Sequence, residues 1–303
     1  METSTSSVMT SFEISDIEDF TSCHLAALNA GSPTYTDPST GYKVMTSDTL
    51  LKRGRCCGCG CRHCPFAHSN VEMSKRPEII SNPALLHGSF DEYKDSECID
   101  VLFWSGGKDS YLALRSLNLQ NSSVLLLTTF DASSRTVAHQ EVPITTIVRQ
   151  AEALRLPLLG VPLHSHVRYE VRVSEALRYV NEHLNLKVKR VCNGDLHLES
   201  VKKWREDMLG SIVTEIGAKA YSPLFKKDYK ELLADLVASG TPCTVCALGD
   251  EQCWGGRDAC VKVGDMFDEN IVKILEENGA DGFGENGEFH TLAEVWKEGA
   301  NRY

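Results

Sequence analysis

IDVLFWSGGKDSYLAL, at residues 99–114, runs from an apolar segment through a glycine-rich loop into a helical pattern. Its first six residues predict a buried strand, and the spacing of Tyr111, Leu112 and Leu114 predicts the apolar face of a helix. In the loop between them, two adjacent glycines let backbone N–H groups approach an anion, and the helix adds the positive end of its dipole. The segment therefore predicts a strand, a phosphate-binding loop and a helix.

The loop also offers charged groups to a phosphate. Lys108 supplies a mobile cation, whereas Asp109 would repel phosphate, so we expect Asp109 to hold a Mg²⁺ ion that bridges phosphate oxygens. The loop is not a Walker A motif, because GxxxxGK[ST] requires glycine where the chain has Leu102 and Ser or Thr where it has Asp109. The alternative is a polar turn that only caps a helix. The predicted phosphate-binding residues are Ser105, Gly106, Gly107, Lys108, Asp109 and Ser110.

From residue 98 onward, short apolar runs alternate with helical periodicity, as in a parallel sheet covered by helices. We expect a doubly wound, Rossmann-like α/β domain over residues 96–303, with ligands beyond the carboxyl ends of its strands. At one such end, Thr129 and Phe130 would contact an adenine, although a buried strand end explains them equally well. The predicted strands are residues 99–104, 124–130, 158–163, 189–193, 219–222 and 243–248.

The remaining N-terminal part divides into a predicted disordered tail at 1–45, rich in Ser and Thr, and a Cys-rich module with its linker at 46–95. Zinc takes four tetrahedral S or N ligands and an iron–sulfur cluster takes four thiolates, so the module is predicted to bind one of them. Which cysteines ligate stays open, and reduced, reactive thiols are the alternative. The candidate ligands are Cys56, Cys57, Cys59, Cys61 and Cys64. The segment resembles a small Cys-rich domain of unknown function with a CCGxGCRxCP core.

Charge and composition limit the kinds of binding partner and the cellular compartment that we expect. Lys and Arg number 31 and Asp and Glu number 42, so the net charge of −11 disfavours nucleic acid and anionic membranes as partners. No run approaches the ~20 apolar residues of a membrane span, and the acidic amino terminus lacks the basic and apolar regions of a secretory signal. We therefore expect a cytoplasmic protein whose cysteines are reduced or bind metal.

A second glycine-containing segment, GENGEFHT, occupies residues 284–291. Its glycines permit turns with positive φ, and its two carboxylates and one Asn offer oxygen ligands to ammonium or Mg²⁺. The segment predicts an active-site loop, with a polar turn as the alternative. Residues 282–287 also spell GxGxxG, but no helix of a first βαβ unit follows, so we exclude a dinucleotide site.

SGGKDS and GENGEFHT together resemble the diphthine-ammonia ligase-like branch of the PP-loop ATP pyrophosphatases, also called the adenine nucleotide α-hydrolase superfamily. The resemblance extends from about residue 100 to residue 295. It includes NGD at residues 193–195, PL at 223–224 and GR at 256–257. One departure is Phe225, where family members commonly have Trp.

This resemblance implies an ATP-dependent amide ligase that splits ATP, with Mg²⁺, into AMP and pyrophosphate and amidates an activated carboxylate with ammonia. The best-known acceptor in that family is the diphthine side chain of elongation factor two. The resemblance assigns the pyrophosphate loop to residues 105–110 and a strand-end motif at the nucleotide to Gly194. The catalytic residues that it implies are Lys108, Asp109, Asp195, Glu285, Asn286 and Glu288.

Two other functions remain open at this point. A PP-loop enzyme that thiolates tRNA would use cysteines to carry sulfur or an iron–sulfur cluster, although the acidic charge and GENGEFHT disfavour it. A non-catalytic adenine-nucleotide-binding module would use the Cys-rich segment to dock partners without turnover. Bound tRNA would favour the first of these, and nucleotide binding without AMP formation would favour the second.

Overall fold

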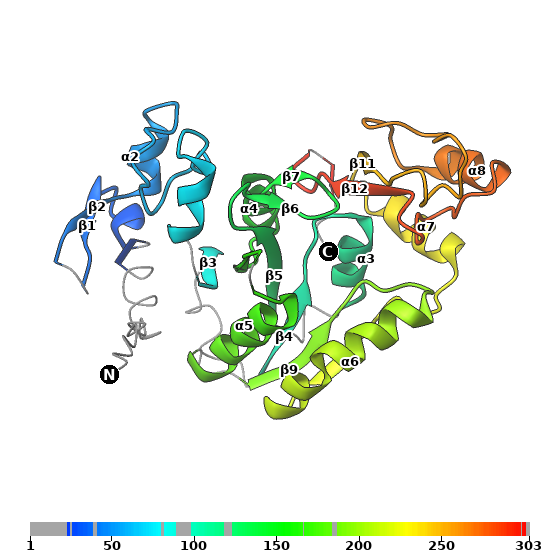
Figure 1. Cartoon of the computed structure of the whole chain (residues 1–303), viewed down its shortest axis with the longest axis horizontal. Helices are drawn as coiled ribbons and strands as arrows, with labels where there is room; N and C mark the ends of the chain where they lie inside the picture. Colours follow the sequence, from blue (N-terminus) through cyan, green and yellow to red (C-terminus); the bar gives the residue numbers. More distant parts are fainter. Residues whose placement is uncertain are drawn as a thin grey trace, which may run out of the picture.

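The computed structural model describes residues 23–24, 26–38, 41–79, 82–88, 98–117, 123–165, 167–183, 187–297 and 299–300. Figure 1 shows an N-terminal segment in blue at one side and a larger α/β body built around the central strands. The first 22 residues of the predicted tail lie outside the described residues.

The larger body is built on a six-stranded sheet in the order β10-β9-β4-β5-β8-β3. The first five strands of that order run parallel, and β3 pairs antiparallel with β8 at the edge. Central strands are buried almost throughout, because helices cover both faces of a parallel sheet. The predicted α/β fold is confirmed. The strands are β3 (Ala84–His87), β4 (Cys98–Phe103), β5 (Ser123–Asp131), β8 (Leu158–Leu163), β9 (Lys187–Cys192) and β10 (Lys219–Tyr221).

Helices contribute to two separate hydrophobic cores, one on each face of the sheet. The first core contains buried side chains of α3 (Lys108–Ser116), α4 (Ile144–Leu154), α7 (Tyr229–Ala238) and α8 (Glu269–Glu277). The second contains those of α5 (Tyr169–His183) and α6 (Glu199–Glu215). None of the helices that the structure describes is long and apolar enough to cross a membrane.

One predicted strand lies outside the central sheet. β11 (Cys243–Leu248) pairs antiparallel with β12 (Phe289–Ala293) in a two-stranded sheet. Side chains along β11 alternate between buried and partly exposed, which suits an antiparallel strand with one covered face. A strand of the central parallel sheet would be covered on both faces. Between β5 and α4, β6 (Thr136–Val137) and β7 (Val142–Pro143) form another small antiparallel pair.

Part of the predicted disordered tail is ordered. β1 (Thr34–Thr36) pairs antiparallel with β2 (Lys43–Met45), and α2 (Ser47–Leu51) and the 3₁₀ helix η1 (Met73–Glu78) follow. Composition missed these strands because tertiary contacts stabilise them. Buried Tyr35 and Asp37 pack against the Cys-rich segment, where Arg62 donates to Asp37 at 2.7 Å. Ordered structure therefore begins before residue 45.

The order of the sheet places the phosphate loop at its switch point. β4 lies between β5 and β9, so the chain leaves β4 where the order of the strands reverses, and the loops after β4 and β9 meet at the carboxyl edge. Gly194, after β9, lies so close to α3 that an added Cβ would be 2.9 Å from the carbonyl of Asp109. The fold therefore brings SGGKDS and residues 193–195 together.

A buried glutamine links the loop after β4 to β12 through hydrogen bonds. The side-chain amide of Gln150, on α4, donates to the carbonyl oxygens of Gly106 at 2.8 Å and Ala293 at 2.7 Å. Its carbonyl accepts the indole N–H of Trp104 at 2.9 Å. Because Gln150 is fully buried, no water replaces these partners if the amide is lost.

We expect Gln150→Leu to lower the free energy of unfolding by about 2 kcal/mol or more, because it leaves the buried indole N–H and the carbonyl of Ala293 without a partner. Chemical denaturation measures the change. Gln252→Leu, at an exposed position, is the matched control and should change stability by less than about 0.5 kcal/mol. Equal effects of the two substitutions would contradict this role of Gln150.

Candidate nucleotide site

The phosphate loop has the backbone shape that the sequence predicts. Gly106 has φ +83°, and an added Cβ would lie 2.5 Å from Gln150 Oε1 and 2.6 Å from Ile147 Cδ1, so only glycine fits there. Gly107 is the N-cap of α3. The hydroxyl of Ser105 accepts the N–H of Gly107 at 3.3 Å. This geometry leaves the amino end of α3 next to the loop, where an anion is favoured.

The two charged residues of the loop form a pair. The ammonium of Lys108 donates to Asp109 Oδ2 at 3.0 Å, and the Lys108 side chain is only 3% exposed. Burial raises the pKa of Asp109, and the charge of Lys108 opposes this rise. The second oxygen, Asp109 Oδ1, is buried and has no hydrogen-bond partner among the described residues. A carboxylate oxygen with a free lone pair suits Mg²⁺, so the residue fits the predicted ion.

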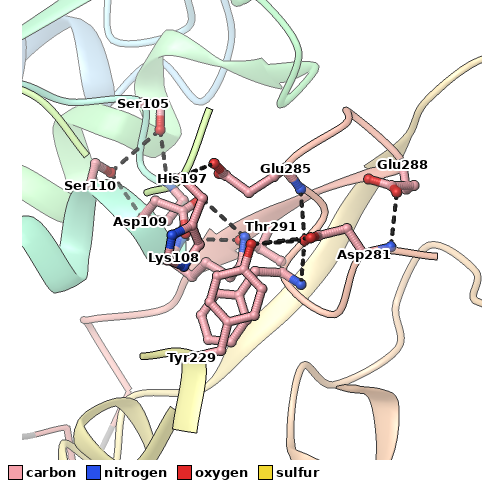
Figure 2. A network of polar contacts seen from close by, with 12 residues as sticks. Ser105, Lys108, Asp109, Ser110, His197, Tyr229, Asp281, Glu285, Glu288 and Thr291 are labelled. Atoms are coloured by element: carbon pink, nitrogen blue, oxygen red, sulfur yellow. Dashed lines mark hydrogen bonds and ion pairs between the residues drawn. The ribbon is translucent and has the colours of Figure 1, made fainter. Parts of the chain in front are cut away.

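The second predicted segment lies directly on this loop. The hydroxyl of Thr291 accepts the backbone N–H of Lys108 at 3.0 Å, and the N–H of Ala293 donates to the carbonyl of Gly106 at 2.8 Å. Figure 2 shows Lys108 and Asp109 beside Thr291 and the 281–288 loop. Two motifs that are 183 residues apart in the sequence therefore border one site.

The carboxylate that orders the GENGEFHT segment is one that the sequence reasoning missed. Asp281 Oδ1 accepts the N–H of Phe283 at 2.9 Å and of Glu285 at 3.1 Å. The Tyr229 hydroxyl donates to the same carboxylate at 3.1 Å. The local sequence DGFG at residues 281–284 indicates a turn, but it does not reveal that Tyr229, on α7, contacts the carboxylate of Asp281.

Glu288 is a buried structural carboxylate. Its side chain is 1% exposed and accepts the N–H of Asp281 at 3.0 Å on Oε1 and the N–H of Asn286 at 3.0 Å on Oε2. The amide of Asn286 also donates to Glu288 Oε1 at 3.1 Å, while the rest of Asn286 is exposed. These contacts explain how the loop keeps its shape, and the predicted catalytic roles of both residues stay predictions.

Glu285 differs from Glu288, although both belong to the same short segment. One of its oxygens accepts the N–H of His197 at 3.1 Å, so the loop contacts the chain after β9. Burial raises the pKa of Glu285; the His197 N–H opposes this rise, and the nearby charge of Asp109 adds to it. Glu285 is therefore the GENGEFHT carboxylate that lies in the field of the phosphate loop.

Asp195 lies beside a separate cavity. Arg205 donates to its two oxygens at 3.0 and 3.2 Å, so this carboxylate is paired within the protein. A cavity of about 540 Å³ lies between α6 and strands β9 and β10, and Asp195, Tyr221 and Phe225 line it. Asn193, also in its lining, is buried and has an amide oxygen without a described partner. The structure thus pairs Asp195 with Arg205 beside this cavity, while Gly194 contacts the backbone of Asp109.

The predicted adenine contact has a different environment from the one expected. Phe130 is fully buried in the first core, and the guanidinium of Arg135 lies 5.6 Å from its ring centroid. The structure thus favours the alternative of a buried strand end for Phe130. Thr129 is half-buried and forms a side-chain hydrogen bond with Tyr169.

The five cysteines of the N-terminal module lie close together, and four of them form two pairs. Cys57 Sγ and Cys61 Sγ are 3.3 Å apart, Cys56 and Cys64 contact each other, and Cys59 Sγ donates to the Cys57 carbonyl at 3.7 Å. Hydrogen bonds from Cys59 and Cys61 lower the pKa of Cys57 to about 7. Within the described residues, no group of three or more His, Cys, Asp or Glu is arranged to hold a metal ion. The predicted metal site therefore stays a prediction.

A parallel sheet with a glycine-rich loop at its switch point is the arrangement of a nucleotide-binding α/β domain. Residues 99–220 match the family model described as diphthamide synthase N-terminal domain, which agrees with the resemblance inferred from SGGKDS, whereas GENGEFHT lies outside the matched residues. Residues 23–70 match a family of unknown function, DUF5522. The chain also resembles a solved structure described as a predicted subunit of tRNA methyltransferase from Methanocaldococcus jannaschii. That match has 17% identity and a TM-score of 0.35, and it covers 64% of this chain and 95% of the other.

We expect Glu288→Gln to destabilise the 281–288 loop, because an amide cannot accept all of the N–H groups that the buried carboxylate accepts. Unfolding should become easier by about 1–3 kcal/mol, and amide hydrogen exchange should rise at Asp281 and Asn286. Glu285→Gln is the matched control, since this side chain accepts one backbone N–H and should leave stability nearly unchanged. Unaltered exchange in Glu288→Gln would contradict the structural role.

Proposed function

We propose that the protein is an ATP-dependent, AMP-forming amide ligase that activates a carboxylate and amidates it with ammonia. The observation that carries this proposal is the hydrogen bond from the Lys108 N–H to the Thr291 hydroxyl, which joins SGGKDS to GENGEFHT. Both segments carry the resemblance to diphthine-ammonia ligase-like proteins, and the first lies within the matched region. A shared site supports a shared reaction more strongly than either motif alone.

In the proposed reaction, the N–H groups at the start of α3 and the ammonium of Lys108 bind phosphates of ATP. Mg²⁺ held by Asp109 would neutralise phosphate charge. The acceptor carboxylate attacks the α-phosphorus and pyrophosphate leaves; ammonia then attacks the acyl carbon and AMP leaves. Glu285 would hold ammonium or take its proton, because its raised pKa makes it a stronger base than an exposed glutamate.

The acceptor in this proposal is a carboxylate, and diphthine on elongation factor two is the first candidate to test. The net charge of −11 argues against a tRNA substrate. If the protein thiolated tRNA instead, it would retain tRNA on purification, and ATP turnover would depend on tRNA rather than on ammonia. AMP formation with and without each acceptor therefore separates the two reactions.

We expect Lys108→Ala and Asp109→Ala each to lower AMP formation by about 10²-fold or more, because each removes a charge that acts on the phosphates in the transition state. Chromatographic separation of ATP, ADP and AMP measures this, with circular dichroism to check folding. Lys230→Ala, on the exposed side of α7, is the control and should retain wild-type turnover. Wild-type AMP formation by both loop variants would refute the assignment of the loop.

For the Cys-rich module, proposed to extend over residues 46–95, we expect about one zinc ion or one iron–sulfur cluster per chain, because thiolates this close bind such metals tightly. Elemental analysis of protein purified under reducing conditions without chelator measures the content. The double variant Cys57→Ser/Cys61→Ser should lose the metal, whereas Cys98→Ser, at the start of β4, should keep it. Metal-free wild-type protein would contradict the prediction.

A further inference from the structure

The ammonium of Lys108 lies inside a group of three aromatic rings. Lys108 Nζ is 5.3 Å from the ring centroid of Phe267, 5.5 Å from that of Phe283 and 5.3 Å from that of Phe289. All three distances lie within the ~6 Å over which a cation is attracted to a ring face. We refer to Phe267, Phe283 and Phe289 as the aromatic cage.

The C-terminal part of the chain supplies the whole cage. Phe267 precedes α8 and is anchored by its N–H, which donates to the carbonyl of Cys243 on β11 at 2.7 Å. Phe283 stacks on Tyr229 with ring centroids 4.3 Å apart, and its N–H donates to Asp281. Phe289 is the first residue of β12. None of the three lies within the matched residues 99–220.

The rings also hold one another in place. Phe267 meets Phe283 edge-to-face at 5.4 Å between centroids and lies 5.7 Å from Phe289. Each of the three is at most 4% exposed. Because buried rings that pack together have few other rotamers, the cage is a rigid surface for the flexible lysine stem.

A buried ammonium needs compensation for its lost hydration. Asp109 provides one charge partner at 3.0 Å, but a second carboxylate in direct contact with the ammonium would neutralise Lys108 and repel a phosphate. Ring faces attract the ammonium through their quadrupole and carry no net charge, so they stabilise the cation while leaving its charge for a phosphate. Attraction to the rings is stronger here than on a surface, since water is excluded.

We propose that Phe267, Phe283 and Phe289 are positioning residues for Lys108, which hold its ammonium beside the phosphate loop so that nucleotide phosphate meets an ordered, already desolvated cation. The inference deepens the proposed nucleotide site and rests on it. It also makes the C-terminal segment part of the phosphate site. Plain hydrophobic packing of the three rings is the competing explanation, and it requires no attraction between the rings and the ammonium.

The first experiment tests the cage without any nucleotide. In protein with ¹³Cε-labelled lysine, the Hε protons of Lys108 should resonate upfield of the other lysines because of the ring currents, with the signal assigned by its loss in Lys108→Gln. Phe267→Leu should move this signal towards the ordinary lysine position, whereas Phe66→Leu, in the Cys-rich module, should not. An ordinary chemical shift for Lys108 in the wild-type protein would overturn the proposal.

The second experiment separates ring electrostatics from ring packing. Phe267 is replaced in turn by mono-, di- and trifluorophenylalanine, which weaken the negative potential of the ring face stepwise with little change in volume. Calorimetric titration with ATP and Mg²⁺ should show affinity falling with each fluorine, to about tenfold weaker binding for the trifluoro ring, while circular dichroism shows that the fold is retained. The same series at Phe66 should leave affinity unchanged.

Packing alone predicts equal affinity across the Phe267 series, and that result would overturn the proposal, as would tighter binding with fluorination. Failure of the proposed function has a different signature. If wild-type protein binds no ATP, the nucleotide assignment fails, and the position of the lysine Hε signal still decides whether the rings surround the ammonium. An upfield Lys108 signal together with graded loss of ATP affinity supports the cage as a device for phosphate binding.

Discussion

The hydrogen bond from the Ala293 N–H to the Gly106 carbonyl joins the last strand of the chain to the phosphate loop, and the rest of the site depends on this contact. Gln150 bonds to both residues and fixes their separation from within the core. Once β12 is seated in this way, Thr291 reaches the first N–H of α3 and the loop before β12 lies near Lys108. Without it, the glycine-rich loop would still cap α3, but the charged groups of the C-terminal segment would not lie beside it.

The parts of the fold and of the site that could be predicted from the sequence are those with a local sequence pattern. SGGKDS is recognisable because strand, loop and helix follow one another within 16 residues, and glycine at 106 is required by local backbone geometry. Gln150, Asp281 and Phe267 stand in no motif, and their roles come from partners that are distant in the sequence. A glutamine or a phenylalanine can have many structural roles, and its role in this protein is determined by the residues that pack against it.

Burial is the second limit on prediction, because a strand pattern does not say which side of a strand end faces a ligand. For Phe130, which follows an apolar run, the sequence supports an adenine contact and a buried strand end equally, and in the structure its ring is fully buried. The short strands β1 and β2 were missed for a related reason. They have too few residues for a period to be visible, and Tyr35 and Asp37 acquire their burial from the Cys-rich segment.

The distribution of charge explains why one lysine is so strongly held. Burial is the main cause that raises the pKa of Asp109 and of Glu285; Asp281 adds to both rises, Asp109 adds to that of Glu285, and the charge of Lys108 opposes both. A polyphosphate entering such a site would be repelled unless further positive charge came with it. Asp109 Oδ1, buried and without a described partner, is where a divalent cation would reduce that repulsion most directly. The aromatic cage complements this arrangement, because it stabilises Lys108 without adding another negative charge.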